Sequence, residues 1–231
     1  MIVQMAFLVF GIVIAAIVFG PGVWVKRTLA RYSQPEDRYS GSGAQLARHM
    51  LDEHDLKSVK VEETSAGDHY DPRDKAVRLL PQHYSGHSLT AITVAAHEVG
   101  HAIQDATGYK PLKLRTRLVI ATRGLEKIGA GILILSPFVG ALTRVPSLAG
   151  LMFLGGFLSL GTSTLIHVIT LPTEFDASFG KALPELNRLR ILKTVDRPHA
   201  RKILRAAAMT YVAASLMSLL NIARWLAILR R

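Results

Sequence analysis

Residues 89–108 read LTAITVAAHEVGHAIQDATG, and this stretch organises the rest of the chain. Its apolar residues recur at helical spacing over nearly five turns. Ser88 precedes the first periodic residue as a suitable N-cap, and Gly108 follows the last one, where helices commonly end. The pattern therefore predicts one helix of about 18 residues between these two signals.

His97, Glu98 and His101 form an HExxH motif on this expected helix. Residues four apart share a helix face, so the two imidazoles converge on one point while Glu98 lies beside them. Such a pair typically holds zinc, with the Glu placed to take a proton from a water at the ion. A catalytic zinc usually has three protein ligands. Because the chain contains no cysteine, the third must be another His or a carboxylate.

The segments before this helix have ordinary soluble character. Residues 44–56, AQLARHMLDEHDL, place apolar side chains at helical spacing and predict a short amphipathic helix. Residues 58–63 alternate apolar and polar side chains, and residues 75–80 follow a DPRD turn, so these segments predict a short β ribbon. The VRLL edge of that ribbon, residues 77–80, is a candidate to bind an extended peptide as an added strand.

Long uncharged stretches predict membrane spans on both sides of this region. The first, Met5–Val25, is followed at once by Lys26 and Arg27, which reverses the charge order of a cleaved signal peptide and indicates an uncleaved anchor. The others are a hairpin of two spans, one between Lys127 and Arg144 and one at Pro146–Leu171. A fourth segment, Ala206–Ala223, either spans the membrane or packs against the other helices.

The charges indicate how these spans are oriented. The chain has 28 Lys+Arg against 17 Asp+Glu, and 14 of the 28 lie on residues 26–117 with 8 more on residues 172–205. The positive-inside rule places both segments on the cytoplasmic side of the plasma membrane. Since the basic residues flank the spans without interleaved aromatics or a recognised binding motif, we expect anionic lipid headgroups as partners and no nucleic acid.

The third ligand is expected among the carboxylates after the motif. These are Asp105, Glu126, Glu174, Asp176, Glu185 and Asp196. Asp105 is one turn beyond His101 and suits a polar role at the helix end. Glu174 and Asp176 directly follow the third span, where a helix returns to the cytoplasm. Thr173 and Asp176 have the spacing of a capping box, which gives Asp176 a structural role. We therefore assign Glu174 as the ligand and keep Asp176 as the alternative.

Several motifs in one order resemble the YugP-type neutral zinc metallopeptidases of bacterial membranes. The resemblance covers nearly the whole chain and rests on GDHYDP at 67–72, VRLLPQHYSG at 77–86, AAHEVGHAIQ at 95–104, LPTEFDAS at 171–178 and AAAMTYVAASL at 206–216. It implies a zinc-dependent peptidase with His97 and His101 as ligands and Glu98 as the base.

The arrangement is also similar to the membrane proteases of the heat-shock and CAAX-processing group. There an HExxH helix and a later Glu ligand are separated by a transmembrane hairpin, which again implies Glu174 as the third ligand. That group has an Asp four residues after the ligand Glu to orient a ligand His, and this chain has Ser178 at that place. Ser178 or Asp176 is therefore the candidate partner of a ligand His.

Together these patterns predict a mainly α membrane protein with three to four transmembrane helices and a small α+β, zincin-like cytoplasmic domain. The expected parts are an N-terminal anchor, a cytoplasmic region with the HExxH helix, a transmembrane hairpin, a cytoplasmic helical segment with the third ligand, and a C-terminal transmembrane or membrane-packed helix: residues 1–25, 26–117, 125–171, 172–205 and 206–231.

The expected activity is that of a gluzincin-like zinc metalloendopeptidase with one Zn²⁺ per chain. It would hydrolyse peptide or protein substrates, membrane proteins among them, with a zinc-activated water and Glu98 as general base. Candidate oxyanion donors precede the helix, although each is more often a packed or turn residue: His69, Tyr70, His83 and Tyr84. His167 is expected to be structural.

Two other functions fit part of the pattern. A protease with HExxH inside the bilayer is disfavoured because the uncharged run 88–96 is too short to span. A non-catalytic membrane scaffold or chaperone with a structural metal is disfavoured because a structural ion needs no base at Glu98.

Overall fold

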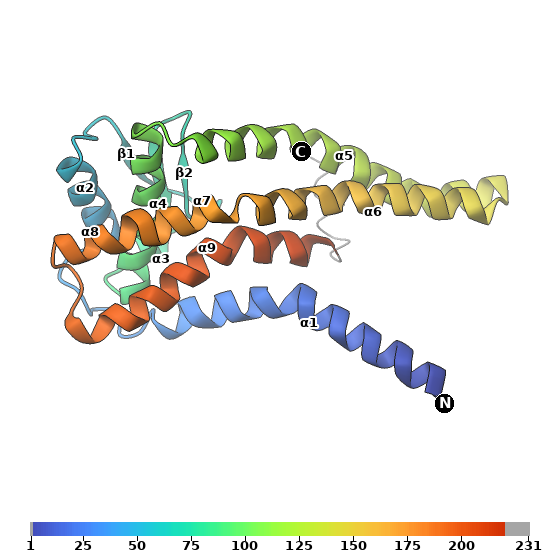
Figure 1. Ribbon diagram of the computed structural model, residues 1–231, viewed down its shortest axis with the longest axis horizontal. Coiled ribbons are helices and arrows are strands. Elements are labelled where there is room, and N and C mark those ends of the chain that lie inside the picture. Colours follow the sequence, from blue (N-terminus) through green and yellow to red (C-terminus); the bar gives the residue numbers. More distant parts are fainter. Residues whose placement is uncertain (1, 220–231) are drawn as a thin grey trace. The chain divides into compact units, whose positions relative to one another are not determined.

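The computed structural model describes residues 2–219, which are mainly helical with one small sheet (Figure 1). This confirms the expected mainly α fold. The elements in chain order are α1 (Ile2–Arg31), α2 (Gly43–Glu53), β1 (Lys60–Glu63), β2 (His69–Asp71), β3 (Ala76–Leu79), α3 (Pro81–Tyr84), α4 (Leu89–Ala106), α5 (Lys110–Thr143), α6 (Pro146–Ile169), α7 (Leu171–Phe175), the π-helix η1 (Asp176–Ala182), α8 (Leu183–Arg188), the 3₁₀ turn η2 (Thr194–Asp196) and α9 (Arg197–Leu219).

The chain divides into two compact units. The helical unit contains the described parts of Met1–Gly22, Leu114–Thr170 and Tyr211–Arg231. The site unit contains Val23–Lys113 and Leu171–Thr210. The HExxH helix and Glu174 therefore belong to the same compact unit, although a hairpin of two long helices separates them in the chain.

Three helical runs are long and apolar enough to cross a membrane: Leu8–Arg31, Lys110–Thr143 and Ser147–Arg188. They overlap the first three expected spans. Helix α5 begins at Lys110, well before the uncharged residues 128–143, so the charged residues between them belong to the same continuous helix. Helix α9, which holds the fourth expected segment up to Leu219, is not among the three, and residues 220–223 of that segment lie outside the described residues.

Helices α5 and α6 of the helical unit form a hairpin whose backbones approach closely. A Cβ atom on Gly156 would lie 2.8 Å from the carbonyl oxygen of Gly129. One turn away, the Ser159 hydroxyl donates a hydrogen bond to the carbonyl oxygen of Leu125 at 2.7 Å. Small residues at such a crossing allow the backbone contact that stabilises helix pairs in lipid.

The sheet differs from the expected ribbon. Its strand order is β1-β3-β2, with β1 parallel and β2 antiparallel to the central β3. Strand β2 was missed because three residues, His69–Asp71, are too few to show alternation. Because β3 is paired along both edges, the expected addition of a peptide strand along VRLL is wrong, and the open edges belong to β1 and β2.

Helix α4 is the centre of the site unit, where it packs against α2, η1 and the sheet. Every residue from Leu89 to Gln104 is buried, as expected for a helix covered on all sides. Ser88 caps its first turn by accepting a hydrogen bond from the amide of Ala91, which confirms the expected N-cap. The enclosure leaves the polar residues of α4 no bulk solvent, so their partners must come from the protein or from a ligand.

Candidate metal centre

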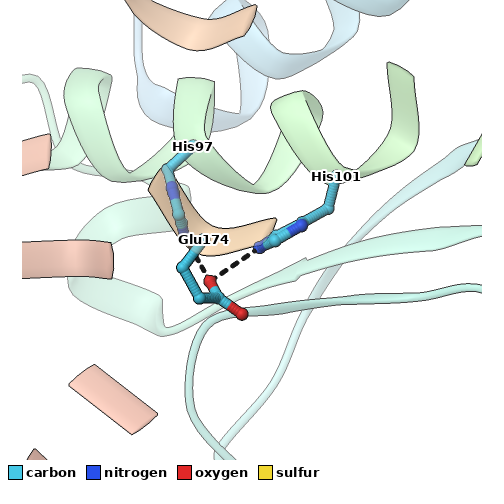
Figure 2. A group of neighbouring side chains, drawn as sticks. All are labelled: His97, His101 and Glu174. Carbon is cyan, nitrogen blue, oxygen red and sulfur yellow. Dashed lines mark hydrogen bonds and ion pairs between the residues drawn. The ribbon is translucent and has the colours of Figure 1, made fainter. Parts of the chain in front are cut away.

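His97 and His101 project from one face of α4 and are almost completely buried (Figure 2). Their ring centroids lie 4.9 Å apart and the ring planes are inclined by 76°. This is the convergence that the four-residue spacing predicts. Each side chain is only 2% exposed, so water does not satisfy its ring nitrogens to any large extent.

Glu174 reaches both histidines from α7. Its Oε2 atom lies 3.0 Å from Nε2 of His101 and 3.4 Å from Nε2 of His97. One ligand atom from each of the three residues lies within 4.8 Å of the others (Figure 2). Among residues 2–219, this is the group of His and carboxylate side chains whose arrangement could hold a metal ion.

The Nδ1 atom of His101 contacts Gln104, one turn further along α4. Nδ1 lies 2.9 Å from Oε1 of Gln104. The Gln104 amide nitrogen donates to the carbonyl oxygen of Thr173 at 2.9 Å and to Oδ2 of Asp176 at 2.7 Å. The amide is thereby oriented with its oxygen, a pure acceptor, towards His101. Nδ1 of His101 must therefore carry a proton, so in the neutral ring it is the Nε2 lone pair that faces Glu174.

A second contact has the same effect on His97. Its Nδ1 atom lies 2.9 Å from the hydroxyl of Ser178, which donates its own proton to the carbonyl oxygen of Leu204 at 3.0 Å. The hydroxyl oxygen is therefore free to accept from His97, so Nδ1 is again the protonated nitrogen. In their neutral forms, both histidines therefore present an unprotonated Nε2 to Glu174.

Gly100 allows η1 to approach α4 closely enough for these contacts. A Cβ atom on Gly100 would lie 2.5 Å from the carbonyl oxygen of Ala177, a backbone atom that cannot move aside alone. Ala177 immediately precedes Ser178, and η1 directly follows the α7 turn that carries Glu174. The glycine inside HEVGH thus permits the packing that brings Glu174 and Ser178 to the histidines.

The residues present fit a zinc ion by the chemistry of their donor atoms. Two neutral imidazole nitrogens and one carboxylate oxygen are the ligand set of many catalytic zinc sites. The hydrogen bonds on both Nδ1 atoms are the contacts that usually accompany histidine ligands. Glu98, three residues before His101, is also buried, at 4% exposure.

The structure separates the two candidates for the third ligand. Asp176 lies outside the converging group, and its carboxylate accepts from Gln104 instead of capping a helix with Thr173. Of the two candidate partners of a ligand His, Ser178 contacts His97 directly, whereas Asp176 acts on His101 through Gln104. Gln104 was missed by the sequence analysis, although its position three residues after His101 places it on the same helix face.

Each of the four candidate oxyanion donors has a contact with a residue outside the His97–His101–Glu174 group. Nδ1 of His69 contacts the carbonyl oxygen of Gly67, and Nδ1 of His83 contacts Asp68 at 2.8 Å. Tyr84 packs against the core. The Tyr70 hydroxyl donates to Asp105 at 2.7 Å, and both its burial and this bond raise the pKa of Tyr70 far above its ordinary value.

Two further expectations concern structural residues. Asp105 lies near the end of α4, where it accepts hydrogen bonds from Tyr70 and Lys75 and ties the helix to the sheet. His167 belongs to the helical unit, where its ring stacks on Tyr211 with centroids 5.7 Å apart.

Two buried histidines of an HExxH helix that converge with a glutamate from α7 are the arrangement typical of zinc metallopeptidases. The comparison with known families agrees. The profile of the family described as "putative neutral zinc metallopeptidase" matches residues 7–230, and the chain belongs to that family. This confirms the expected family.

The chain is also similar to one curated bacterial protein. The "putative membrane protease YugP" of Bacillus subtilis (strain 168) is 35% identical over 206 residues, which cover 88% of this chain and 88% of the relative. No solved structure matches the chain.

Proposed function

We propose that this protein is a membrane-embedded zinc metalloendopeptidase in which His97, His101 and Glu174 hold one zinc ion per chain and Glu98 is the general base. Peptides or proteins are its substrates. The observation that carries this proposal is the arrangement of three donor atoms within 4.8 Å, two of them imidazole nitrogens whose lone pairs are exposed by hydrogen bonds on the opposite ring nitrogen.

The chemistry divides between the ion and the chain. Zinc bound there supplies a Lewis acid that polarises the scissile carbonyl and lowers the pKa of water towards about 7. Glu98 accepts a proton from the attacking water while the oxygen of that water forms a bond to the carbonyl carbon. Glu98 then returns that proton to the amide nitrogen as the C–N bond breaks, so that one acid and one amine are released.

The surroundings of Glu98 favour this role. Its side chain is 4% exposed, so bulk water is largely excluded from the carboxylate. It occupies the position three residues before His101, so it shares a side of α4 with one ligand. These features support proton transfer at the ion more than a purely structural metal site, which requires no such carboxylate.

We place the active site on the cytoplasmic face of the plasma membrane in a multi-pass protein. The support is the distribution of charge, because 22 of the 28 basic residues lie on residues 26–117 and 172–205, the segments that also carry the ligands. Cysteine labelling from each side of the membrane tests this placement. A cysteine replacing the exposed Ser58 should react only with reagent that reaches the cytoplasm.

Metal analysis of the purified protein tests the ligand assignment. We expect about one zinc per chain in the wild type and loss of zinc in His97→Ala, His101→Ala and Glu174→Ala. Glu63→Gln, which changes an exposed carboxylate on β1, is the matched control and should retain zinc. Zinc that persists in Glu174→Ala would show that the third ligand lies elsewhere.

A second experiment separates an enzyme from a metal-containing scaffold. Glu98→Gln keeps the shape of the side chain but removes the base, so peptide hydrolysis should fall by at least a thousandfold while zinc remains bound. Hydrolysis that survives this change would rule out Glu98 as the base. A wild-type protein that binds zinc but cleaves no peptide in a broad library would favour the scaffold.

A further inference from the structure

Helices α1 and α9 each carry exposed basic side chains close to where the helix becomes apolar. Arg27 and Arg31 lie near the end of α1, and Arg201, Lys202 and Arg205 lie in the first turns of α9. We refer to these five residues as the basic surface. None of them contributes to the metal centre, so the mechanism leaves their charge unexplained.

A stacked ring pair aligns the two helices at this level. The rings of Tyr32, directly after α1, and His199 on α9 have centroids 5.0 Å apart and planes inclined by 30°. On α1, Lys26 is the charged residue that directly follows the uncharged residues 1–25. On α9, Arg205 is the charged residue that directly precedes the uncharged residues 206–223. Each is six residues from the stacked pair, or about 9 Å along its helix. The boundary between charged and apolar residues therefore lies at the same distance from the Tyr32–His199 ring pair on both helices.

The positive charge of the basic surface is not neutralised by the protein. Within residues 2–219, no ion pair joins these five side chains to a carboxylate. The acidic group nearest to α9 in sequence, Asp196, is fully buried and is bound by Arg38 and Tyr39. The five cations thus remain available to an external anion.

We propose that the basic surface binds the headgroups of anionic phospholipids in the membrane leaflet that the site unit faces. A plane of phosphates is the anion that would meet both charge boundaries at once, because the boundaries are aligned. Four of the five side chains are arginines, whose guanidinium groups bind phosphate oxygens in pairs.

Trp24 marks the depth of this surface on α1. It is 42% exposed and lies three and seven residues before Arg27 and Arg31, so all three share one side of the helix. Tryptophan is enriched at the level of lipid headgroups. The inference depends on membrane insertion and not on peptidase activity, so it stands or falls separately from the proposed function.

Trp24 also provides the measurement. The only other tryptophan is Trp225, so Trp225→Phe leaves Trp24 as a single fluorophore in the full chain. Quenching of its fluorescence by brominated phosphatidylglycerol is compared with quenching by brominated phosphatidylcholine in mixed vesicles. We expect a preference for phosphatidylglycerol of about threefold or more, which decreases when NaCl is raised from about 50 mM to about 500 mM.

Two triple variants of equal charge change test the location. Arg201→Gln/Lys202→Gln/Arg205→Gln should reduce the preference towards one. Lys57→Gln/Lys60→Gln/Arg73→Gln, at exposed positions around the sheet, should retain it. Zinc content reports that the site unit of each variant is folded, and Arg201→Lys/Arg205→Lys should keep most of the preference.

Several outcomes would overturn the proposal. One is equal quenching by the two lipids in the wild type, and another is a preference that does not respond to salt. A preference that the α9 triple variant leaves unchanged would do the same. If duplex DNA instead bound the wild type in neutral vesicles at about 0.15 M salt and competed with phosphatidylglycerol, the surface would be a nucleic-acid site.

Discussion

Nδ1 of His101 lies 2.9 Å from the side-chain oxygen of Gln104, whose nitrogen donates hydrogen bonds to Thr173 of α7 and Asp176 of η1. Helix α4 is therefore connected twice to the continuous α7–η1 segment, through Glu174 to the Nε2 atoms of both histidines and through Gln104 to Nδ1 of His101. Because the same segment supplies both contacts, a shift of this segment alters the position of Glu174 and the orientation of His101 together.

Gln104→Ala should weaken zinc binding without removing any proposed ligand. The substitution removes the acceptor that fixes the proton on Nδ1 of His101 and leaves Asp176 without its donor. Loss of such a partner typically reduces metal affinity by about 10- to 100-fold. The measurement is chelator competition on the purified protein, with Gln82→Ala on exposed α3 as the control. An unchanged affinity would mean that Gln104 does not orient His101.

Gly100→Ala should destabilise the protein and lower its zinc affinity at the same time. The new methyl group would meet the Ala177 carbonyl oxygen at 2.5 Å, so η1 must move away from α4. Overpacking of this kind costs roughly 1–3 kcal/mol of unfolding free energy. Gly124→Ala on α5 has no heavy atom within 4 Å of the added Cβ and should be neutral or slightly stabilising. Equal unfolding temperatures for the two variants would contradict the close-contact role of Gly100.

The sequence was most informative where periodicity is long. Helix α4, its Ser88 cap and the shared face of His97 and His101 follow from spacing along one helix, and the structure shows each of them. Glu174 could be selected only by its place after a long uncharged run and by resemblance. Its distance from the histidines depends on tertiary packing that no local pattern encodes.

Other features were beyond the reach of local patterns. The three-residue strand β2 is too short to show a period, and its pairing with β3 turned an expected ribbon into a three-stranded sheet. The orientation of Gln104 by Asp176 spans 72 positions in the chain. The π-helix η1 packs against α4 at Gly100, and such π segments frequently mark functional sites.

Ser178→Ala should weaken zinc binding through His97. Removal of the hydroxyl leaves Nδ1 of His97 and the carbonyl oxygen of Leu204 without their shared partner in a fully buried position. We expect a loss of zinc affinity of about tenfold or more. Ser178→Asp should not restore it, because the carboxylate would face the Leu204 carbonyl oxygen. Ser85→Ala, at an exposed hydroxyl on the end of α3, is the control for chelator competition. Full affinity in Ser178→Asp would show that the site accepts the acidic partner found in similar proteases.

Asp196→Asn should lower stability at neutral pH but not in acid. Burial raises the pKa of Asp196, but hydrogen bonds from Arg38 and Tyr39 outweigh this effect, so the pKa lies below its ordinary value. A carboxylate with a lowered folded pKa stabilises the protein above its unfolded pKa, about 3.9, and loses that contribution as the pH falls through the folded value. At pH 7 we expect the variant to be less stable by about 2 kcal/mol.

Unfolding of the wild type and Asp196→Asn between pH 7 and about pH 3 measures this difference. The two stabilities should remain apart down to about pH 4 and converge below it, as the wild-type carboxylate becomes protonated. Glu63→Gln, at an exposed carboxylate of β1, should match the wild type at neutral pH. A constant gap between wild type and Asp196→Asn at every pH would mean that the lost stability comes from packing and not from the charge of Asp196.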